Sequence, residues 1–398
     1  MRSPGREPPS RQVDDALLER VRRALASTAE APTPARVAGV LRSEGAVLGD
    51  AAVLEVTEVL RAEISGAGPL ESLLRQPGVT DVLVNGPAEV WLDRGQDLER
   101  AAVRFRDENA VRRLAMRLVA AAGRRLDDAM PYADARLPDG VRLHAVIPPL
   151  ASEGTVISLR VPSARTFGMA ELIGAGTIPP ELVPWLTSLV RGRLAFLVTG
   201  GTGSGKTTIL GALLALCDPG ERIVLVEDSG ELRPDHRHVV RLEARAANVE
   251  GVGRVGLDDL VRQALRMRPD RIVVGEVRGR EVVDLLAALN TGHEGGCGTL
   301  HANSAADVPA RLEALGIAAG LRRDAVHAQV GSALDVVVHL RRWPSGRRAI
   351  TQIDVVGRTA DGWVVTEPAF RVDESGVVGY GPGRAALADR LAHRGWSP

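Results

Sequence analysis

The chain has 398 residues, of which 45% are hydrophobic, so it can build two or three domains with a substantial core. Fifty acidic residues balance fifty basic ones, which excludes a strong overall field toward nucleic acid or anionic lipid. Two cysteines are too few for a disulfide framework, and the sequence shows neither a signal peptide nor an apolar run of membrane-spanning length. We therefore expect a cytoplasmic protein, or one that is peripheral to a membrane through a partner.

The first part of the chain is predicted to be a tail followed by helices. Residues 1–12 are polar and rich in Pro, Gly and Arg, which is typical of a disordered tail. Apolar side chains then recur at helical spacing over residues 13–25 and again over residues 53–64. Residues 13–66 are therefore expected to form a helical prefix.

Residues 67–162 are predicted to form an α+β N-terminal domain. Residues 81–84 and 89–92 alternate between apolar and polar side chains as strands do, and an apolar helix face runs from Val111 to Val119. Further strands are expected over residues 141–147 and 155–161. A Pro- and Gly-rich linker, residues 163–183, follows this domain.

Residues 184–345 alternate between short β-type runs and helical ones, which predicts a mostly parallel sheet wrapped by helices. Residues 346–398 are expected to form a β-rich C-terminal segment with a short terminal helix. The predicted fold class is α/β, with the smaller α+β domain in front. The strands of the larger domain are expected at residues 194–199, 222–227, 239–242, 271–275 and 298–301.

A phosphate-binding loop is the clearest motif. Its pattern is G-x-x-x-x-G-K-[ST], whose backbone N–H groups surround a triphosphate, and an apolar strand precedes it and a helix follows it. Lys206 is the one lysine in the sequence, and its compact ammonium reaches the β and γ oxygens where a planar guanidinium would not fit. We predict a RecA-like ATPase domain that binds ATP rather than a glycine-rich turn without a ligand. The predicted nucleotide-binding residues are Gly200, Gly201, Thr202, Gly203, Ser204, Gly205, Lys206, Thr207 and Thr208.

Carboxylates follow two later apolar strands. Glu227 ends the run 223–226 and is followed by Asp228 and Glu231, and Glu276 ends the run 271–275 as in a Walker B strand. Carboxylates at this edge of the sheet lie near the nucleotide. We predict that Glu276 orients the attacking water, that Thr207 is a Mg²⁺ ligand, and that Glu227 and Glu231 complete the metal shell. The alternative for the first group is an acidic surface turn, and the general base among the three glutamates stays open.

Residues 291–303 form a glycine-rich loop that enters a strand, with a histidine at each end. We expect His301, with His293 as a second candidate, to sense the γ-phosphate. A metal site formed by His293, Cys297 and His301 is an alternative, although the glycines between them do not form the rigid helix that this spacing would need. Plain loop packing is a third interpretation.

These motifs together resemble the signature motifs of the type II/type IV secretion ATPases. The resemblance covers the P-loop, the acidic box 227–232, Val274-Gly275-Glu276-Val277-Arg278-Gly279 and the histidine box 291–303, in this order. The sequence is most similar to the branch of tight-adherence pilus assembly and conjugation-type secretion, because Gly279 follows Arg278 where other branches more often have Asp. Residues 134–144 and 157–160 are similar to the N-terminal domain of that family, so the resemblance extends over about residues 67–345.

The resemblance implies an ATP-hydrolysing, Mg²⁺-dependent motor that assembles a pilus or secretes protein. It implies a homo-hexamer that pushes on an inner-membrane platform protein, with N-terminal-domain arginines near the nucleotide; Arg136, Arg142 and Arg160 are the candidates, and structural ion pairs are the alternative. Val161-Pro162 departs from the family pattern at the domain linker, and Cys297 stands where a small residue is usual.

Two other classes of function stay open. RecA-like sheets also drive nucleic-acid-translocating motors, but the neutral net charge and 3% aromatic content give little to bind a strand, so no strong direct nucleic-acid binding is expected. A nucleotide-gated assembly switch with little turnover is the third class. Stimulation by DNA would support the second, and ATP binding that is indifferent to Glu276→Gln would support the third.

Overall fold

The computed structural model describes residues 20–21, 24–25, 33–44, 46, 49, 52–54, 56–57, 60–61, 66–95, 98–162, 166–245, 247 and 251–398. The chain forms two compact units, Met1–Pro162 and Ser163–Pro398. The expected tail over residues 1–12 lies outside the described residues. No helix in the described parts of the chain is long and apolar enough to cross a membrane.

The described part of the predicted helical prefix contains the helix α2 (Pro34–Ser43). The Thr33 hydroxyl caps its N-terminus by accepting a hydrogen bond from the Arg36 backbone N–H at 3.4 Å. The helix contributes Val37 and Leu41 to a small apolar cluster with other residues of the prefix. The apolar spacing of the prefix is therefore used to build a small core of its own.

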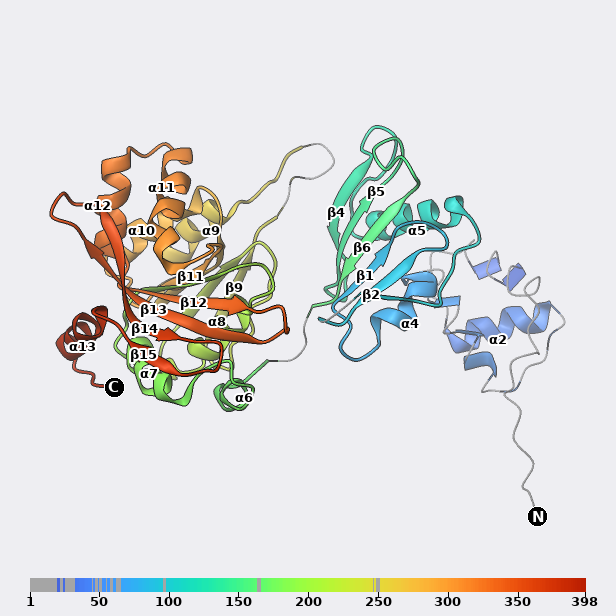
Figure 1. The fold of residues 1–398 in the computed structure, drawn as a ribbon. Coiled ribbons are helices and arrows are strands. Elements are labelled where there is room, and N and C mark those ends of the chain that lie inside the picture. Colours follow the sequence, from blue (N-terminus) through green and yellow to red (C-terminus); the bar gives the residue numbers. More distant parts are fainter. Residues whose placement is uncertain are drawn as a thin grey trace, which may run out of the picture. The chain divides into compact units, whose positions relative to one another are not determined.

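The first unit is built on a six-stranded antiparallel sheet with the order β3-β2-β1-β6-β5-β4 (Figure 1). The predicted strands at 81–84, 89–92, 141–147 and 155–161 are all present, within one or two residues at each end. The elements of this sheet are β1 (Asp81–Val84), β2 (Val90–Asp93), β3 (Leu98–Arg100), β4 (Tyr132–Arg136), β5 (Arg142–Val146) and β6 (Val156–Arg160).

One face of this sheet is covered by the helix α5 (Glu108–Ala121). Asp107 caps α5 by accepting a hydrogen bond from Ala110 N–H at 2.8 Å, and the predicted apolar face from Val111 to Val119 is buried. The short elements η1 (Gly68–Leu70) and α4 (Glu71–Leu74) add Leu70 and Leu73 to the same core. Side chains alternate along β5 and β6 between buried and exposed, so the other face of the sheet stays open.

The second unit contains one nine-stranded sheet with the order β15-β14-β13-β12-β7-β11-β10-β8-β9 (Figure 1). The strands from β12 through β7 to β9 pair in parallel, and β12 to β15 pair antiparallel. This confirms the predicted α/β class with a mostly parallel sheet. The strands are β7 (Phe196–Gly200), β8 (Ile223–Glu227), β9 (Val239–Glu243), β10 (Arg271–Val277), β11 (Cys297–Leu300), β12 (Val336–Arg342), β13 (Arg348–Arg358), β14 (Val364–Val372) and β15 (Val378–Tyr380).

Helices cover both faces of this sheet, and a separate apolar core lies on each face. One core contains residues of α6 (Met169–Gly174), α7 (Val183–Arg191), α8 (Lys206–Leu214) and α13 (Gly383–His393). The other contains residues of α9 (Leu257–Ala264), α10 (Glu281–Asn290), α11 (Val308–Ala318) and α12 (Arg323–Ala333). Short 3₁₀ turns connect some of these elements: η2 (Pro180–Leu182), η3 (Leu265–Met267) and η4 (Ala305–Asp307).

Two segments that were expected to stand apart are packed into the second unit. The stretch 163–183, expected as a linker, contains α6 and η2, and its Leu172, Ile178 and Leu182 are buried in the core with α8. The C-terminal segment 346–398 continues the central sheet through β13 to β15. In both segments the apolar side chains that lie between the prolines and glycines determine the packing.

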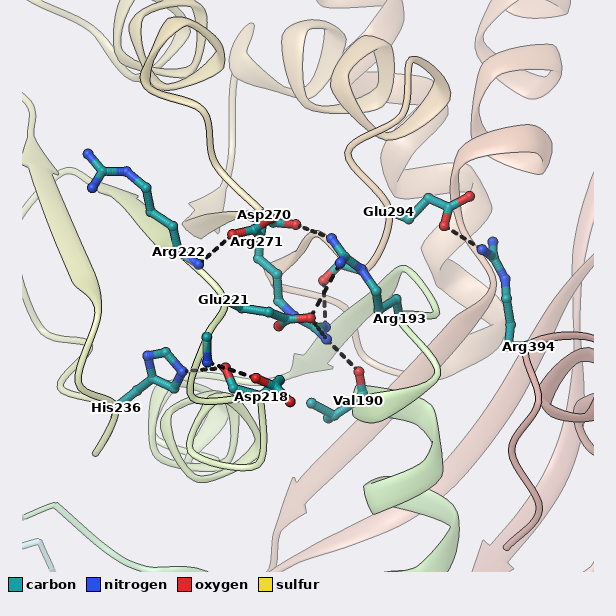
Figure 2. Close-up of polar contacts among 12 residues, drawn as sticks. Val190, Arg193, Asp218, Glu221, Arg222, His236, Asp270, Arg271, Glu294 and Arg394 are labelled. Atoms are coloured by element: carbon teal, nitrogen blue, oxygen red, sulfur yellow. Dashed lines mark hydrogen bonds and ion pairs between the residues drawn. The ribbon is translucent and has the colours of Figure 1, made fainter.

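A buried ion pair lies at the edge of the sheet opposite the P-loop (Figure 2). The Arg271 side chain is 1% exposed and donates to both carboxylate oxygens of Glu221, at 2.5 and 3.2 Å. Its remaining N–H groups donate to the backbone carbonyls of Val190 at 2.7 Å and Gly295 at 3.2 Å. The guanidinium therefore connects α7, β8, β10 and the loop before β11, and its fork geometry satisfies all four acceptors.

Candidate nucleotide-binding site

The predicted functional motifs converge because their strands are neighbours. The P-loop follows β7 and His301 follows β11, whereas Glu276 lies in β10 and Glu227 ends β8. These four parallel strands are adjacent in the order β7-β11-β10-β8. Parallel strands end at the same edge of a sheet, so the four motifs share one edge although up to 101 positions separate Gly200 from His301 in the sequence.

The P-loop backbone requires glycine at three positions. Gly200, Gly203 and Gly205 have φ values of 149°, 69° and 95°. A Cβ atom on Gly200 would also lie 2.5 Å from the carbonyl oxygen of Leu340 and 2.7 Å from the Ser204 hydroxyl. The loop is therefore held closely against the end of β12, and α8 begins directly after it with its N-terminal N–H groups at the loop.

The Lys206 ammonium lies inside this loop. It donates hydrogen bonds to the carbonyls of Gly200 at 3.1 Å and Gly201 at 2.9 Å, and the residue is only 8% exposed. Burial lowers the pKa of Lys206, and the nearby Glu276 carboxylate acts in the opposite direction. The one lysine of the chain is thus a desolvated point charge held at the phosphate cradle.

Glu276 and His301 face each other across neighbouring strands. The His301 Nε2 and Glu276 Oε1 atoms lie 3.6 Å apart, and both side chains are partly exposed. The pairing of β10 with β11 shifts register between Val274 and Val277, and Glu276 lies within this irregular stretch. Burial lowers the pKa of His301, as does the Lys206 charge, whereas Glu276 raises it. Lys206, Glu276 and His301 therefore form one electrostatically coupled group.

Glu227 is buried at the end of β8. One of its oxygens accepts hydrogen bonds from the backbone N–H groups of Glu231 at 3.0 Å and Leu232 at 2.9 Å. The other oxygen is buried and accepts no hydrogen bond from a described residue. Burial raises the pKa of Glu227 to about 7, against the effect of the two backbone donors. A cation or a water molecule would satisfy the second oxygen.

The remaining acidic residues of this edge have separate roles. Asp228 forms an ion pair with Arg278 at 2.6 Å, which connects the loop after β8 to the loop after β10. Glu231 is exposed, and its backbone N–H donates the hydrogen bond to Glu227. Asp270 lies at the opposite edge, where it accepts the Arg222 backbone N–H at 2.7 Å. Asp270 is therefore at the other end of β10 from Glu276.

The residues present fit a Mg²⁺ ion. Thr207 and Thr208 are half-buried in the first turn of α8, next to Lys206, so a hydroxyl oxygen lies at the cradle. Glu227 offers a buried carboxylate oxygen that has no other partner among the described residues. A hydroxyl with one or two carboxylates and the substrate phosphates is the usual ligand set for Mg²⁺ in such sites.

His293 does not reach this site. It precedes β11 and His301 follows it, so the strand Cys297–Leu300 separates the two histidines along its length. Cys297 is fully buried in the sheet. The metal site proposed as an alternative from these three residues is therefore wrong, and no group of three or more metal-ligating side chains occurs within the described ranges.

The three candidate arginines of the first unit lie in one row. Arg136 is paired with Arg142 between β4 and β5, and Arg142 is paired with Arg160 between β5 and β6. The row lies on the open face of the sheet, and Arg160 also forms an ion pair with Asp81 at 3.1 Å. Three guanidinium groups in one row place several N–H donors side by side, which is an arrangement that suits an anion with several oxygens.

Three basic residues beside the P-loop were not predicted from the sequence. The hairpin between β12 and β13 pairs Arg342 with Arg348. A Cβ on Gly203 would lie 3.4 Å from an Arg342 nitrogen, and one on Gly205 would lie 3.9 Å from Arg348 Cδ. In β12, His339 Nδ1 lies 2.9 Å from the Thr199 hydroxyl. The sequence signal that could have indicated this hairpin is the turn Pro344-Ser345-Gly346, because it lies between the arginine pairs 341–342 and 347–348.

The chain belongs to the Type II/IV secretion system protein family, which matches residues 63–367. It is thus an ATPase motor of the secretion and conjugation class, as the resemblance implied.

Two relatives and one solved structure describe the similarity. The chain is 54% identical over 354 residues to a putative conjugal transfer protein of Mycobacterium tuberculosis, covering 87% of this chain and 99% of that protein. It is 32% identical over 305 residues to the type IV secretion system protein PtlH of Bordetella pertussis, covering 69% and 88%. The crystal structure of the pilus retraction motor PilT with bound ADP shares the fold, with a TM-score of 0.51 and 23% identity over 72% of this chain and 81% of that chain.

Proposed function

We propose that the chain hydrolyses ATP in a Mg²⁺-dependent reaction and uses the energy to power pilus assembly or protein export through an inner-membrane platform. The observation that carries this proposal is the convergence of Lys206, Glu276, His301 and Glu227 at one edge of the parallel sheet. Each of the parts that phosphoryl transfer needs is present there, namely a phosphate cradle, a carboxylate for water and a cationic or polar contact for the γ-phosphate.

Each side chain has a role that follows from its position. The P-loop N–H groups and Lys206 hold the phosphates, and Glu276 orients and polarises the attacking water. His301 follows β11, which lies between the P-loop strand β7 and the Glu276 strand β10, and we propose that it senses the γ-phosphate. Thr207 and Glu227 would hold Mg²⁺, which when bound neutralises charge on the β- and γ-phosphates.

The arginine row supports a shared nucleotide site. Arg136, Arg142 and Arg160 place three guanidinium groups on one sheet face of the first unit, where they could together donate hydrogen bonds to a triphosphate. The family is typically hexameric, and we propose a homo-hexamer in which these arginines contact the nucleotide.

The branch within the family is also proposed. The Arg278-Gly279 pair and the similarity to a relative named as a putative conjugal transfer protein favour the tight-adherence and conjugation-type group. Such a motor would work in the cytoplasm, peripheral to the membrane through its platform partner.

The first test is the steady-state ATPase rate of the full chain at increasing protein concentration, with Lys206→Ala as the blank. A rate per chain that rises with concentration and is lost in the variant supports sites that are shared between subunits. A rate at the blank level at every concentration, with and without membranes that contain the platform protein, would contradict the enzymatic proposal and favour the nucleotide-gated switch.

Glu276→Gln separates the remaining classes of function. A motor should retain ATP binding and lose turnover by about 10²-fold or more, because the side chain keeps its shape but no longer polarises water. A switch should bind ATP with unchanged affinity and show no turnover to lose. Stimulation of the wild-type rate by single-stranded DNA would instead support a nucleic-acid motor.

A further inference from the structure

The hairpin between β12 and β13 runs past the P-loop. β12 pairs with β7 as far as Leu340, which lies opposite Gly200 at the end of β7. β12 then continues for two more residues, and its last residue, Arg342, pairs with Arg348 of β13. At about 3.3 Å per residue, the hairpin extends about 7 Å beyond the end of β7. It therefore borders the space that the P-loop occupies.

Arg342 and Arg348 lie on the same face of the sheet as the helix α8. Leu340 of β12 and Ile350 of β13 both belong to the apolar core to which α8 contributes. Side chains two residues apart in a strand lie on one face, so Arg342 continues the face of Leu340 and Arg348 continues the face of Ile350. Arg341, one residue before Arg342, lies on the opposite face.

Both arginine side chains of this face contact the surroundings of the P-loop glycines. A Cβ atom on Gly203 would lie 3.4 Å from a guanidinium nitrogen of Arg342, and one on Gly205 would lie 3.9 Å from Arg348 Cδ. Arg342 is exposed and Arg348 is half-buried. With Lys206, three cationic side chains border one phosphate-binding loop. Guanidinium groups are suited to this place, because their parallel N–H groups match the oxygens of a phosphate.

The two arginines lie on the opposite side of β7 from the groups proposed to act on the γ-phosphate. In the sheet, β12 and β13 lie on one side of β7, whereas β11 and β10, the strands of His301 and Glu276, lie on the other side. The backbone of a P-loop surrounds the α- and β-phosphates, and the γ-phosphate lies toward the attacking water. Contacts from the β12–β13 side therefore fit the part of the nucleotide that ATP and ADP share.

We propose that Arg342 and Arg348 bind the α- and β-phosphates of the nucleotide held by the P-loop of the same chain. This inference rests on the proposed ATPase function and adds two binding residues to it. Contacts that are equal in ATP and ADP change the affinity for both nucleotides by the same factor. Their loss should therefore appear in the KM for ATP rather than in kcat.

Binding of ADP and of a non-hydrolysable ATP analogue to the full chain, measured by calorimetry, tests the proposal. Arg342→Ala and Arg348→Ala should each weaken the binding of both nucleotides by about 10- to 100-fold, the range for a lost hydrogen bond to a charged group. Arg342→Lys should recover part of this loss, because it keeps the charge but not the two parallel N–H groups. The same measurements in Arg342→Lys decide the question if an alanine variant does not fold.

Arg341→Ala is the matched control. It removes the same charge from the same hairpin one residue away, but on the opposite face, and should leave both Kd values close to wild type. Unchanged Kd values in the Arg342 and Arg348 variants would overturn the proposal. A loss confined to the ATP analogue would also overturn it, because the contact would then be to the γ-phosphate. An equal loss in Arg341→Ala would overturn it as well, since only the overall charge would then matter.

The outcome is separable from that of the proposed hydrolysis, because binding is measured without turnover. Equal ATPase rates in wild type and Lys206→Ala would refute hydrolysis and leave the arginine contacts to be decided by the Kd values. Wild-type turnover with equal ADP affinity in wild type, Arg342→Ala and Arg348→Ala would refute the contacts and leave hydrolysis in place.

Discussion

Replacing Gly275 by alanine would place a methyl group against the most perturbed carboxylate of the site. Gly275 lies in β10 next to Glu276, and its φ lies outside the left-handed region, so the alanine backbone is allowed. Its Cβ would lie 2.7 Å from Glu227 Cγ and 3.3 Å from a Glu227 oxygen. The substitution therefore acts through Glu227 and not through backbone strain.

The magnitude follows from this overlap. Ordinary contact begins at 3.4 Å, so the Glu227 side chain must move by roughly 0.7 Å, the difference from 2.7 Å. Overpacking of this kind costs about 1–3 kcal/mol, which the lower chain entropy of alanine offsets by about 0.4–1 kcal/mol. We expect a net loss of about 1–2 kcal/mol in the free energy of unfolding, and a fall in kcat of about 10- to 100-fold because Glu227 leaves its position.

The assay combines urea unfolding of the nucleotide-free protein with the ATPase rate after subtraction of the Lys206→Ala blank. Gly357→Ala in β13 is the matched control, because a Cβ there would have no atom within 4 Å. It should leave both measurements close to wild type. Rates are compared well below the melting temperature, so that the folded fraction is the same in all samples.

A second background shows whether Glu227 is the cause. In Glu227→Ala the Cγ atom is absent, so adding Gly275→Ala should cost no further stability, although activity stays low. A Gly275→Ala variant with wild-type stability and wild-type kcat would refute the reasoning. A stability loss of the same size in the Glu227→Ala background would show that some other contact is responsible.

Three further predictions follow from the same structure. Burial raises the pKa of Glu227 from 4.5 to about 7, so the folded state favours the protonated form, and this stabilisation is lost as the pH rises from about 4.5 through about 7. Relative to Glu227→Gln, the wild type should lose up to roughly 3 kcal/mol of unfolding free energy over this window, and an equal pH dependence of urea unfolding in the two proteins would contradict the shift. Glu221→Ala leaves the Arg271 guanidinium buried without its carboxylate and should cost about 3–5 kcal/mol in urea unfolding, most of which a joint Arg271→Met change should restore. Arg142→Ala removes the central charge of the arginine row and should raise the KM for ATP about tenfold; an unchanged KM would indicate that the row serves another ligand.

Local features of the fold could be predicted well. The helix face from Val111 to Val119, the strand before the P-loop and the strand 81–84 all appear where the spacing of apolar side chains placed them. The strands β3, β4 and β15 were not expected. Residues 98–100 of β3 are all exposed, and β15 has only three residues. Neither β3 nor β15 therefore shows the alternation of apolar and polar side chains by which a strand is recognised.

The candidate site divides along the same line. Residues 200–208 could be assigned from the sequence because the P-loop is contiguous, and its chemistry depends on residue types at fixed spacing. That Glu227, Glu276 and His301 meet depends on the strand order β7-β11-β10-β8, which results from pairing between segments far apart in the chain. The sequence alone could place each of them at the end of a strand, but not beside one another.

The sequence by itself determined the class of the protein, its two sheets and the phosphate cradle around Lys206, because these depend on local period and on contiguous motifs. Tertiary structure alone decided the contact between His339 and Thr199, the arginine pair beside the P-loop and the separation of His293 from His301. The physical reason is that a polar contact near 2.9 Å requires a particular register between strands, and register is set by packing over the whole sheet.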